Sequence, residues 1–400
     1  AAGLSISEKM RKQIRGLDQA STNAEDGVSA VQTAEGALTE VHSMLQRMNE
    51  LAVQASNGTN SQTDRDAIQS EIDQLTTEID RVAETTKFNE TYLLKGDANG
   101  ATKKMYLEAH DAGLKGKLTD NGDGTATFVM DELKAGDSVT IAGKSYTIGA
   151  TKDDTDALID AADGNSHADI VINGTTYKYM AAQGTGADDS AANAKAGYYA
   201  DGKWTATGDA KSVDDLKTAA GAGSTVEADG KKLTSLKGAD VTAGVSSADS
   251  SVITKANAYV LAANELLAAN KIGDTEGNAA VTDTADAAIT LNNGDGTFKI
   301  KLAQTEVAEK LNFNLHVGSD ADMTNKINVN IETMNSSYLG IKGLNVSDDT
   351  GVGATYAVDA IADALQKVSD QRSSLGAVQN RLEHTIANLD NVVENTTSAE

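Results

Sequence analysis

Two stretches of regularly spaced apolar residues, one near each end of the chain, constrain the fold more than any other feature. The C-terminal stretch keeps one seven-residue register through Ile361, Leu365, Val368, Leu375, Leu382, Ile386, Leu389 and Val393, with Arg372 and Gln379 at intervening seam positions. The N-terminal stretch advances in steps of three and four through Val31, Ala34, Leu38, Val41, Leu45, Met48 and Ala52. This spacing predicts long helices that each carry a single apolar stripe.

The N-terminal region contains a second helical pattern after a break. The Ser-Asn-Gly-Thr-Asn run at residues 56–60 predicts the end of the first helix. A further helix is expected after Thr63, with Asp64 in its first turn, and it should end before Phe88. Because a helix with one apolar stripe is not stable alone, we expect the three helices to form one elongated bundle, with both termini at the same end.

Composition divides the chain into three parts. The helical patterns occupy residues 1–97 and 311–400, whereas residues 98–310 are rich in Gly, Asp, Thr and Ala. We therefore predict an α+β fold in which both chain ends build a coiled-coil-like core and residues 98–310 form an inserted β-rich region. The insertion is expected to hold two subdomains, at about 98–185 and 225–310.

The insertion shows short strands joined by Asn-Gly, Asp-Gly or Ala-Gly turns. Such turns between alternating residues are strong hairpin signals. They predict hairpins over residues 139–148, 170–177 and 226–233, and helical pieces are expected over residues 156–162 and 252–269. Residues 181–224 have little periodicity and are predicted to be loop or poorly packed. Flanking strands are expected at Tyr92–Leu94, Phe313–Val317 and Ile327–Ile331.

The charge balance excludes several classes of partner. Acidic residues outnumber basic ones by 59 to 34, which gives a net charge of −25. A nucleic-acid binder needs a basic stripe for the phosphates, and an anionic membrane surface attracts basic segments. No apolar run approaches the roughly 18 residues of a membrane span. The absence of cysteine also excludes disulfides and thiolate chemistry.

Motifs for catalysis and metal binding were sought without success. The five histidines are not spaced as helical metal ligands, and neither a His-Glu-x-x-His motif nor a glycine-rich phosphate loop occurs. The Asp-Asn-Gly-Asp-Gly run at residues 120–124 lacks the order of a calcium loop and favours a hairpin turn. Trp204, Tyr198 and Tyr199 favour a small local core over a carbohydrate or protein contact. We therefore expect no enzymatic activity, cofactor or metal.

Motifs at both ends resemble bacterial flagellin. On the N-terminal side these are Gly-Leu-Asp-Gln-Ala-Ser-Thr-Asn-Ala-Glu-Asp-Gly at residues 16–27, Thr-Ala-Glu-Gly-Ala-Leu at 33–38 and Leu-Gln-Arg-Met-Asn-Glu-Leu-Ala-Val-Gln at 45–54. On the C-terminal side the run Ser-Leu-Gly-Ala-Val-Gln-Asn-Arg-Leu at 374–382 matches the family pattern. The resemblance covers about 180 residues.

The resemblance implies a structural role. Flagellins pass through the flagellar type III export apparatus and polymerise outside the cell, so the expected partners are other flagellin subunits, an export chaperone and the filament cap. The helical core would line the filament and the insertion would cover its outer surface. Because Ala1 begins within a helical pattern and Glu400 ends within one, this chain is expected to lack terminal helices, and to be monomeric.

The resemblance also implies recognition by a Toll-like innate immune receptor of the host. The family positions of that receptor patch, which overlaps the polymerisation surface, correspond to Arg47, Leu51, Glu71 and Arg381. Arg47 and Leu51 are four residues apart and should share one helix face. The chain departs from the family at Asn49, where many members carry a second basic residue.

Two alternative functions are compatible with parts of the sequence. The insertion is compatible with an adhesin-like binding role on a helical stalk. A hook–filament junction protein would share the terminal helices, but the Leu-Gln-Arg run at residues 45–47 and the Gly-Ala-Val-Gln-Asn-Arg run at 376–381 favour the filament subunit.

Overall fold

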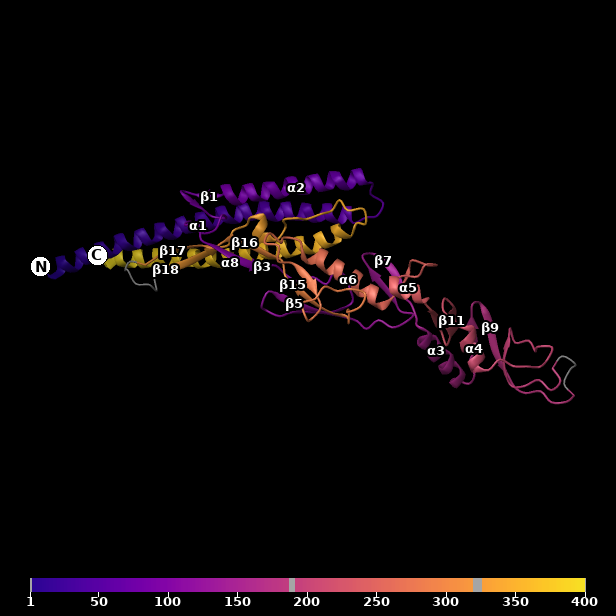
Figure 1. The fold of residues 1–400 in the computed structure, drawn as a ribbon. Coiled ribbons are helices and arrows are strands. Elements are labelled where there is room, and N and C mark those ends of the chain that lie inside the picture. Colours follow the sequence, from indigo (N-terminus) through magenta and orange to yellow (C-terminus); the bar gives the residue numbers. More distant parts are fainter. Residues whose placement is uncertain (1, 187–190, 319–325, 400) are drawn as a thin grey trace. The chain divides into compact units, whose positions relative to one another are not determined.

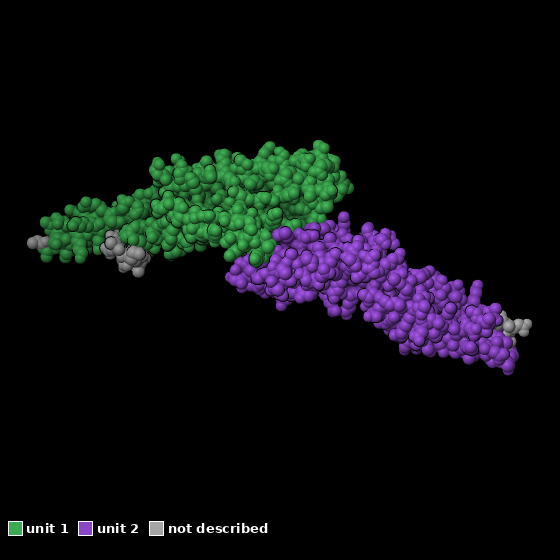
Figure 2. All heavy atoms as spheres, in the orientation of Figure 1, with its two compact units in different colours: residues 1–110, 268–280, 301–400 green, residues 111–267, 281–300 purple. Residues whose placement is uncertain are grey.

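The chain folds into two compact units. The structure is a computed structural model that describes residues 2–186, 191–318 and 326–399. Unit 1 is built from three separate segments and unit 2 from two (Figure 2), with unit 1 taking residues 1–110, 268–280 and 301–400 and unit 2 taking residues 111–267 and 281–300. The predicted domain division at residues 97/98 and 310/311 stays a prediction.

Unit 1 is organised around three long helices. They are α1 (Ala2–Ala55), α2 (Gln62–Thr85) and α8 (Val352–Ala399), with the single-turn α7 (Ser336–Leu339) beside them. At 1.5 Å per residue, the 54 residues of α1 span roughly 80 Å. The helix α1 packs against both α2 and α8 (Figure 1). The predicted α+β class, with a helical core from both ends and a β-rich insertion, is confirmed.

The contact between α1 and α8, here called the seam, is antiparallel. Leu17 and Ala20 of α1 pack with Leu389 of α8, and Ser56 lies against Gly351 at the opposite end. Between these ends, fully buried residues of both helices fill the seam; they include Ala24, Ala34, Leu38, Val41, Leu45, Met48, Ile361, Val368, Leu375 and Leu382. The predicted side-by-side packing of the two ends is confirmed.

Beyond the seam, the first turns of α1 carry exposed apolar side chains. Leu4 is 62% exposed and Ile6 is 55% exposed. The ends of α1 and α8 lie close together in Figure 1, as the bundle prediction required. These apolar side chains at the start of α1 are therefore not covered within this chain.

Six short strands complete unit 1. They pair as three antiparallel two-stranded sheets: β1 (Lys87–Phe88) with β2 (Thr91–Tyr92), β3 (Thr102–Tyr106) with β16 (Gln304–Ala308), and β17 (Leu311–His316) with β18 (Lys326–Ile331). The predicted strands near residues 313–317 and 327–331 are confirmed. The predicted strand at Tyr92–Leu94 is only partly formed, because Leu93 and Leu94 are buried in the core outside any strand.

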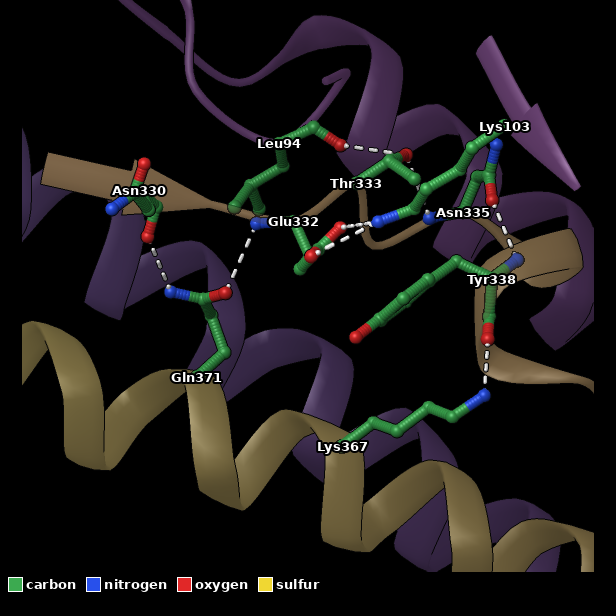
Figure 3. Close-up of polar contacts among 9 residues, drawn as sticks. All are labelled: Leu94, Lys103, Asn330, Glu332, Thr333, Asn335, Tyr338, Lys367 and Gln371. Atoms are coloured by element: carbon green, nitrogen blue, oxygen red, sulfur yellow. Dashed lines mark hydrogen bonds and ion pairs between the residues drawn. The ribbon is translucent and has the colours of Figure 1, made fainter. Parts of the chain in front are cut away.

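The polar residue inside the α8 stripe is not the one that the heptad register indicated. Arg372 and Gln379 are only half-buried, whereas Gln371 is 7% exposed. Its side-chain amide accepts a hydrogen bond from the Glu332 N–H at 3.0 Å and donates one to the Asn330 carbonyl at 3.2 Å. Gln371 thus pairs with the backbone around the end of β18 as a neighbouring strand would (Figure 3), which makes its burial tolerable.

Two cationic side chains reinforce this junction. Lys103 of β3 forms a partly buried ion pair with Glu332 at 3.1 Å. Lys367 of α8 donates to the Tyr338 carbonyl at 2.6 Å and lies 4.9 Å from the centre of the Tyr338 ring (Figure 3). Burial lowers the pKa of Lys367. The Lys103 pair thus joins β3 to the residue that follows β18, and the Lys367 contacts join α8 to α7.

Unit 2 contains three sheets. One has four strands, in the order β14 (Ala280–Thr282), β15 (Thr297–Lys301), β5 (Thr125–Met130), β4 (Gly116–Asp120). Another has three, in the order β13 (Val252–Ile253), β7 (Lys144–Ile148), β6 (Ser138–Ile141). The third has five, in the order β10 (Gly197–Ala200), β9 (Thr175–Met180), β8 (Ile170–Ile172), β11 (Thr225–Ala228), β12 (Lys231–Thr234). The helices are α3 (Lys152–Gly164), α4 (Val213–Ala219), α5 (Gly238–Ala243) and α6 (Lys255–Asn270), the last continuing into unit 1.

The three predicted hairpins of the insertion are confirmed as β6–β7, β8–β9 and β11–β12. At the Asn173-Gly174 turn both residues have positive φ, 50° and 85°. This conformation matches the twist of the flanking strands and favours Asn and Gly at those positions. The run at residues 120–124 is likewise the turn between β4 and β5, as predicted. The helical pieces are confirmed as α3 and α6.

The prediction that residues 181–224 are loop or poorly packed was wrong in part. They contain β10 and α4, and Tyr198 and Tyr199 are 2% and 1% exposed; residues 187–190 lie outside the described part. Trp204 meets the Tyr199 ring edge-on at 4.8 Å between centroids, which confirms the predicted local core. The two tyrosines are buried because β10 pairs with β9. Local periodicity in the sequence cannot predict a contact between these two segments.

His110 is the last residue of the first segment of unit 1. Both its side chain and its backbone form polar contacts. Its Nε2 lies 2.8 Å from the Asp363 carboxylate on α8, and Asn270 exchanges two hydrogen bonds of 2.8 Å with the His110 backbone. Burial alone would lower the pKa of His110. Asp363, with the charges of Asp359 and Glu108, outweighs burial, so the pKa lies above its ordinary value of 6.5.

The seam should dominate the stability of unit 1. Replacing Leu45, which is fully buried, by Ala should lower the free energy of unfolding by about 2–5 kcal/mol, because it removes apolar contacts and leaves a cavity. Urea denaturation followed by circular dichroism measures this. Val53→Ala is the control, because Val53 is 53% exposed on the same helix; an equal loss in both variants would contradict the assignment.

The His110 contact should make stability depend on pH. Because the folded pKa is raised, its contribution is fully present below about pH 6.5 and is lost as pH rises through the folded value. The advantage of the natural chain over His110→Gln should therefore shrink as pH rises from 5.5 to 8. Lys367 also lines this site. A constant difference across the range would rule out the contribution.

Candidate functional site

An exposed ion-pair cluster on α1 and α2, here called the Arg47 patch, consists of Arg47, Glu50 and Glu71. Arg47 Nε donates to Glu71 Oε1 at 3.0 Å, and a terminal guanidinium nitrogen lies 3.3 Å from Glu50 Oε2. Glu50 is reached because residues three apart share a helix face. Glu71 is reached because α2 returns alongside α1 after the break at residues 56–60.

The patch is charged and accessible rather than stabilising. The side chains of Arg47 and Glu71 are 48% and 42% exposed. The hydrogen bond that Arg47 donates to Glu71, followed by the one it donates to Glu50, raises the pKa of Arg47, so the guanidinium stays charged at any physiological pH. Exposed ion pairs of this kind add little to stability, because water screens them and two side chains must be ordered. Their effect is to fix the guanidinium in one orientation.

Leu51 does not share the exposure of Arg47. It is 2% exposed and belongs to the main core of unit 1, together with Met48. The predicted spacing of four along one helix is present, but the helix turns Leu51 inward and Arg47 outward. Within this chain, Leu51 therefore holds α1 in place beneath the patch and offers almost no surface of its own.

Arg381 is exposed on α8 but lies far along the bundle from Arg47. Its neighbour Leu382 comes within 3.2 Å of where a Cβ on Gly27 would stand. Gly27 precedes Arg47 by 20 residues on α1, which at 1.5 Å per residue is about 30 Å. The structure thus joins Arg47 with Glu71 and places Arg381 at a separate position on the helical unit.

Glu50 is the patch member that sequence reasoning missed. Its spacing of three residues from Arg47 was the available signal. Asn49 is half-buried, so it contributes less surface than the exposed Arg47 and Glu50.

Neither a metal cluster nor a membrane-spanning helix is found among the described residues. Across residues 2–186, 191–318 and 326–399, no group of three His, Cys, Asp or Glu side chains could hold a metal ion. Among the helices of that same part of the chain, none has the length and apolar character that a membrane crossing requires. The exposed charges of the Arg47 patch are suited to recognition of another protein.

Comparison with solved structures gives only weak likenesses. FliC of Burkholderia pseudomallei is 20% identical, with 89% of this chain and 99% of that chain covered and a TM-score of 0.31. The flagellar hook-associated protein 3 of Legionella pneumophila is 13% identical, with 98% and 97% covered and a TM-score of 0.36.

Comparison with known sequences is more specific. The profile of the bacterial flagellin N-terminal helical region matches residues 1–99, and that of the C-terminal helical region matches residues 358–400. The flagellin of Clostridium tyrobutyricum is 33% identical over all of this chain and 79% of its own length, and that of Salmonella rubislaw is 33% identical over all of this chain and 82% of its length. With both ends matched and such relatives aligned along its entire length, the chain belongs to the flagellin family.

Proposed function

We propose that this chain is a structural subunit of the bacterial flagellar filament, where it assembles with other flagellin subunits outside the cell. The observation that carries the proposal is the seam, which joins the two family regions into one helical body. Leu4, Ile6 and Val392 are 62%, 55% and 39% exposed near the ends of that body. Exposed apolar side chains of this kind favour burial against another molecule, and neighbouring subunits are the partners that the family supplies.

The route to the filament follows from the same proposal. The subunit would be exported by the flagellar type III apparatus with a chaperone, and would be added beneath the filament cap. The lack of cysteine suits this route, since no disulfide has to form after export. The fold is instead completed by packing of the seam, which requires both ends of the chain.

The second part of the proposal is recognition by a Toll-like receptor of the host through the Arg47 patch. A guanidinium held in place by two carboxylates on a rigid helix is pre-organised for binding, and arginine is enriched among residues that dominate interfaces. Arg381 would form a separate contact along α8 rather than part of the same local cluster. Leu51 would support the patch from below. Filament packing and receptor binding can use the same surface at different times.

Site-specific labelling tests the filament assignment. Because the natural chain has no cysteine, Ser250→Cys in an exposed turn of unit 2 provides a single thiol. When this variant replaces the flagellin of a motile bacterium, a maleimide dye should stain flagella along their full length. Ala34→Cys, at a fully buried seam position, is the control that should stain only after denaturation.

Two outcomes of the labelling experiment contradict the assignment. Stain confined to a short zone at the base of each filament would indicate a hook–filament junction protein. The presence of the labelled chain in the culture medium, with no filament on the cells, would show that it does not assemble.

Receptor activation tests the Arg47 patch. Arg47→Ala should raise the concentration needed for half-maximal activation of a receptor reporter cell by roughly tenfold or more, as expected for an interface residue that dominates binding. Arg81→Ala is the matched control, because Arg81 is an exposed arginine on α2 paired with Glu78 three residues away. Equal activity of Arg47→Ala and the natural chain would remove Arg47 from the receptor site, and the same assay with Arg381→Ala tests the separate contact.

A further inference from the structure

Unit 2 contains a hollow of about 650 Å³ with a leucine-rich floor. Its floor includes Leu133, Leu158, Leu233 and Leu236, which are 6–8% exposed, and its edge includes Val241, which is 48% exposed. The volume falls within the range of small-molecule sites, which are typically apolar clefts with a few charged or polar groups at defined positions.

Local structure keeps the hollow open. Ala150 bridges to the segment after β12, with its N–H donating to the Thr234 carbonyl at 2.7 Å and its carbonyl accepting from Leu236 at 2.9 Å. A Cβ on Gly149 would stand 2.5 Å from Leu236 Cδ1, so glycine is needed to bring this leucine so close. The helix α3 presents Ala157 and Ala161 to the hollow, and these small side chains leave its volume unfilled.

The rim of the hollow carries more lysines than carboxylates, three against two, although the whole chain is acidic. Lys134, Lys231 and Lys255 line it, all three are exposed, and within the described residues none forms an ion pair. Two acidic residues also line it, Glu132 and Asp154. Asp154 is occupied in capping α3, because its carboxylate accepts from the Thr151 N–H at 2.8 Å and from the Thr151 hydroxyl at 3.0 Å.

We propose that this hollow binds a small amphipathic anion, an alkyl or aryl body that carries one carboxylate or sulfonate group. The leucine floor and exposed Val241 gain from covering by an apolar body, because water is displaced from their surface. The three lysines select a negative head group over a neutral or positive one. This binding activity is separate from filament assembly and from receptor recognition, because it rests on the insertion alone.

Titration of the full chain with decanoate, at concentrations far below micelle formation, tests the proposal by calorimetry. One saturable site is expected. Ala161→Trp, which fills the hollow from an exposed position of α3, should weaken binding roughly tenfold or more. The double variant Lys134→Glu, Lys231→Glu should weaken it about tenfold, as expected for the reversal of two exposed charges, and added salt should also weaken binding by the natural chain.

Matched controls make the test decisive. Ala219→Trp and Lys144→Glu alter exposed residues of unit 2 that do not line the hollow, and both should bind decanoate as the natural chain does. Circular dichroism checks that every variant is folded. Absence of saturable binding, or an equal loss in control and hollow variants, would overturn the proposal. Binding of decanol as tight as that of decanoate would overturn the assigned role of the lysines.

Discussion

The seam between α1 and α8 is the interaction on which the remaining structure depends. It joins residues such as Gly27 and Leu382, which are more than 300 positions apart in sequence. With no cysteine available, only packing closes this very long loop, so its entropic cost must be met by apolar burial. Leu38, Leu45, Leu375 and Leu382 are all fully buried there. If either α1 or α8 were disrupted, the apolar stripe of the other helix would be exposed to water.

The seam also explains why the insertion can differ in chemistry without disturbing the helical unit. Unit 2 has cores of its own, including one around Ile159, Ile170 and Leu216 and a stacked Phe128–Phe298 pair. The family profiles match the helical ends, over residues 1–99 and 358–400. The lysine-rimmed hollow lies in unit 2, the part of the chain that the seam does not need. The seam and the surface of the insertion thus rest on separate cores.

Sequence reasoning succeeded where structure is determined locally. The heptad spacing predicted the long helices, and the Asn-Gly turn predicted the β8–β9 hairpin, because positive φ at both turn residues strongly restricts residue choice. It failed where distant segments decide. Gln371 rather than Arg372 is buried because the edge of β18 supplies its hydrogen-bond partners. Tyr198 and Tyr199 are buried because β9 pairs with β10. In the candidate site, the Arg47–Glu71 pair depends on where α2 returns, which periodicity does not specify.

The recognition proposed for the Arg47 patch would depend on the same core that holds the seam. Exposed ion pairs contribute little to folding, so Arg47 and Glu71 can change with little cost in stability, whereas Met48 and Leu51 directly beneath them cannot. Substitutions of the exposed charges alone could abolish the binding of a partner that contacted only those charges. A partner that also contacted the helical surface would be harder to lose by substitution, because the shape of that surface is fixed by residues buried in the core. The physical constraint that makes the subunit assemble therefore also limits how far its surface can vary.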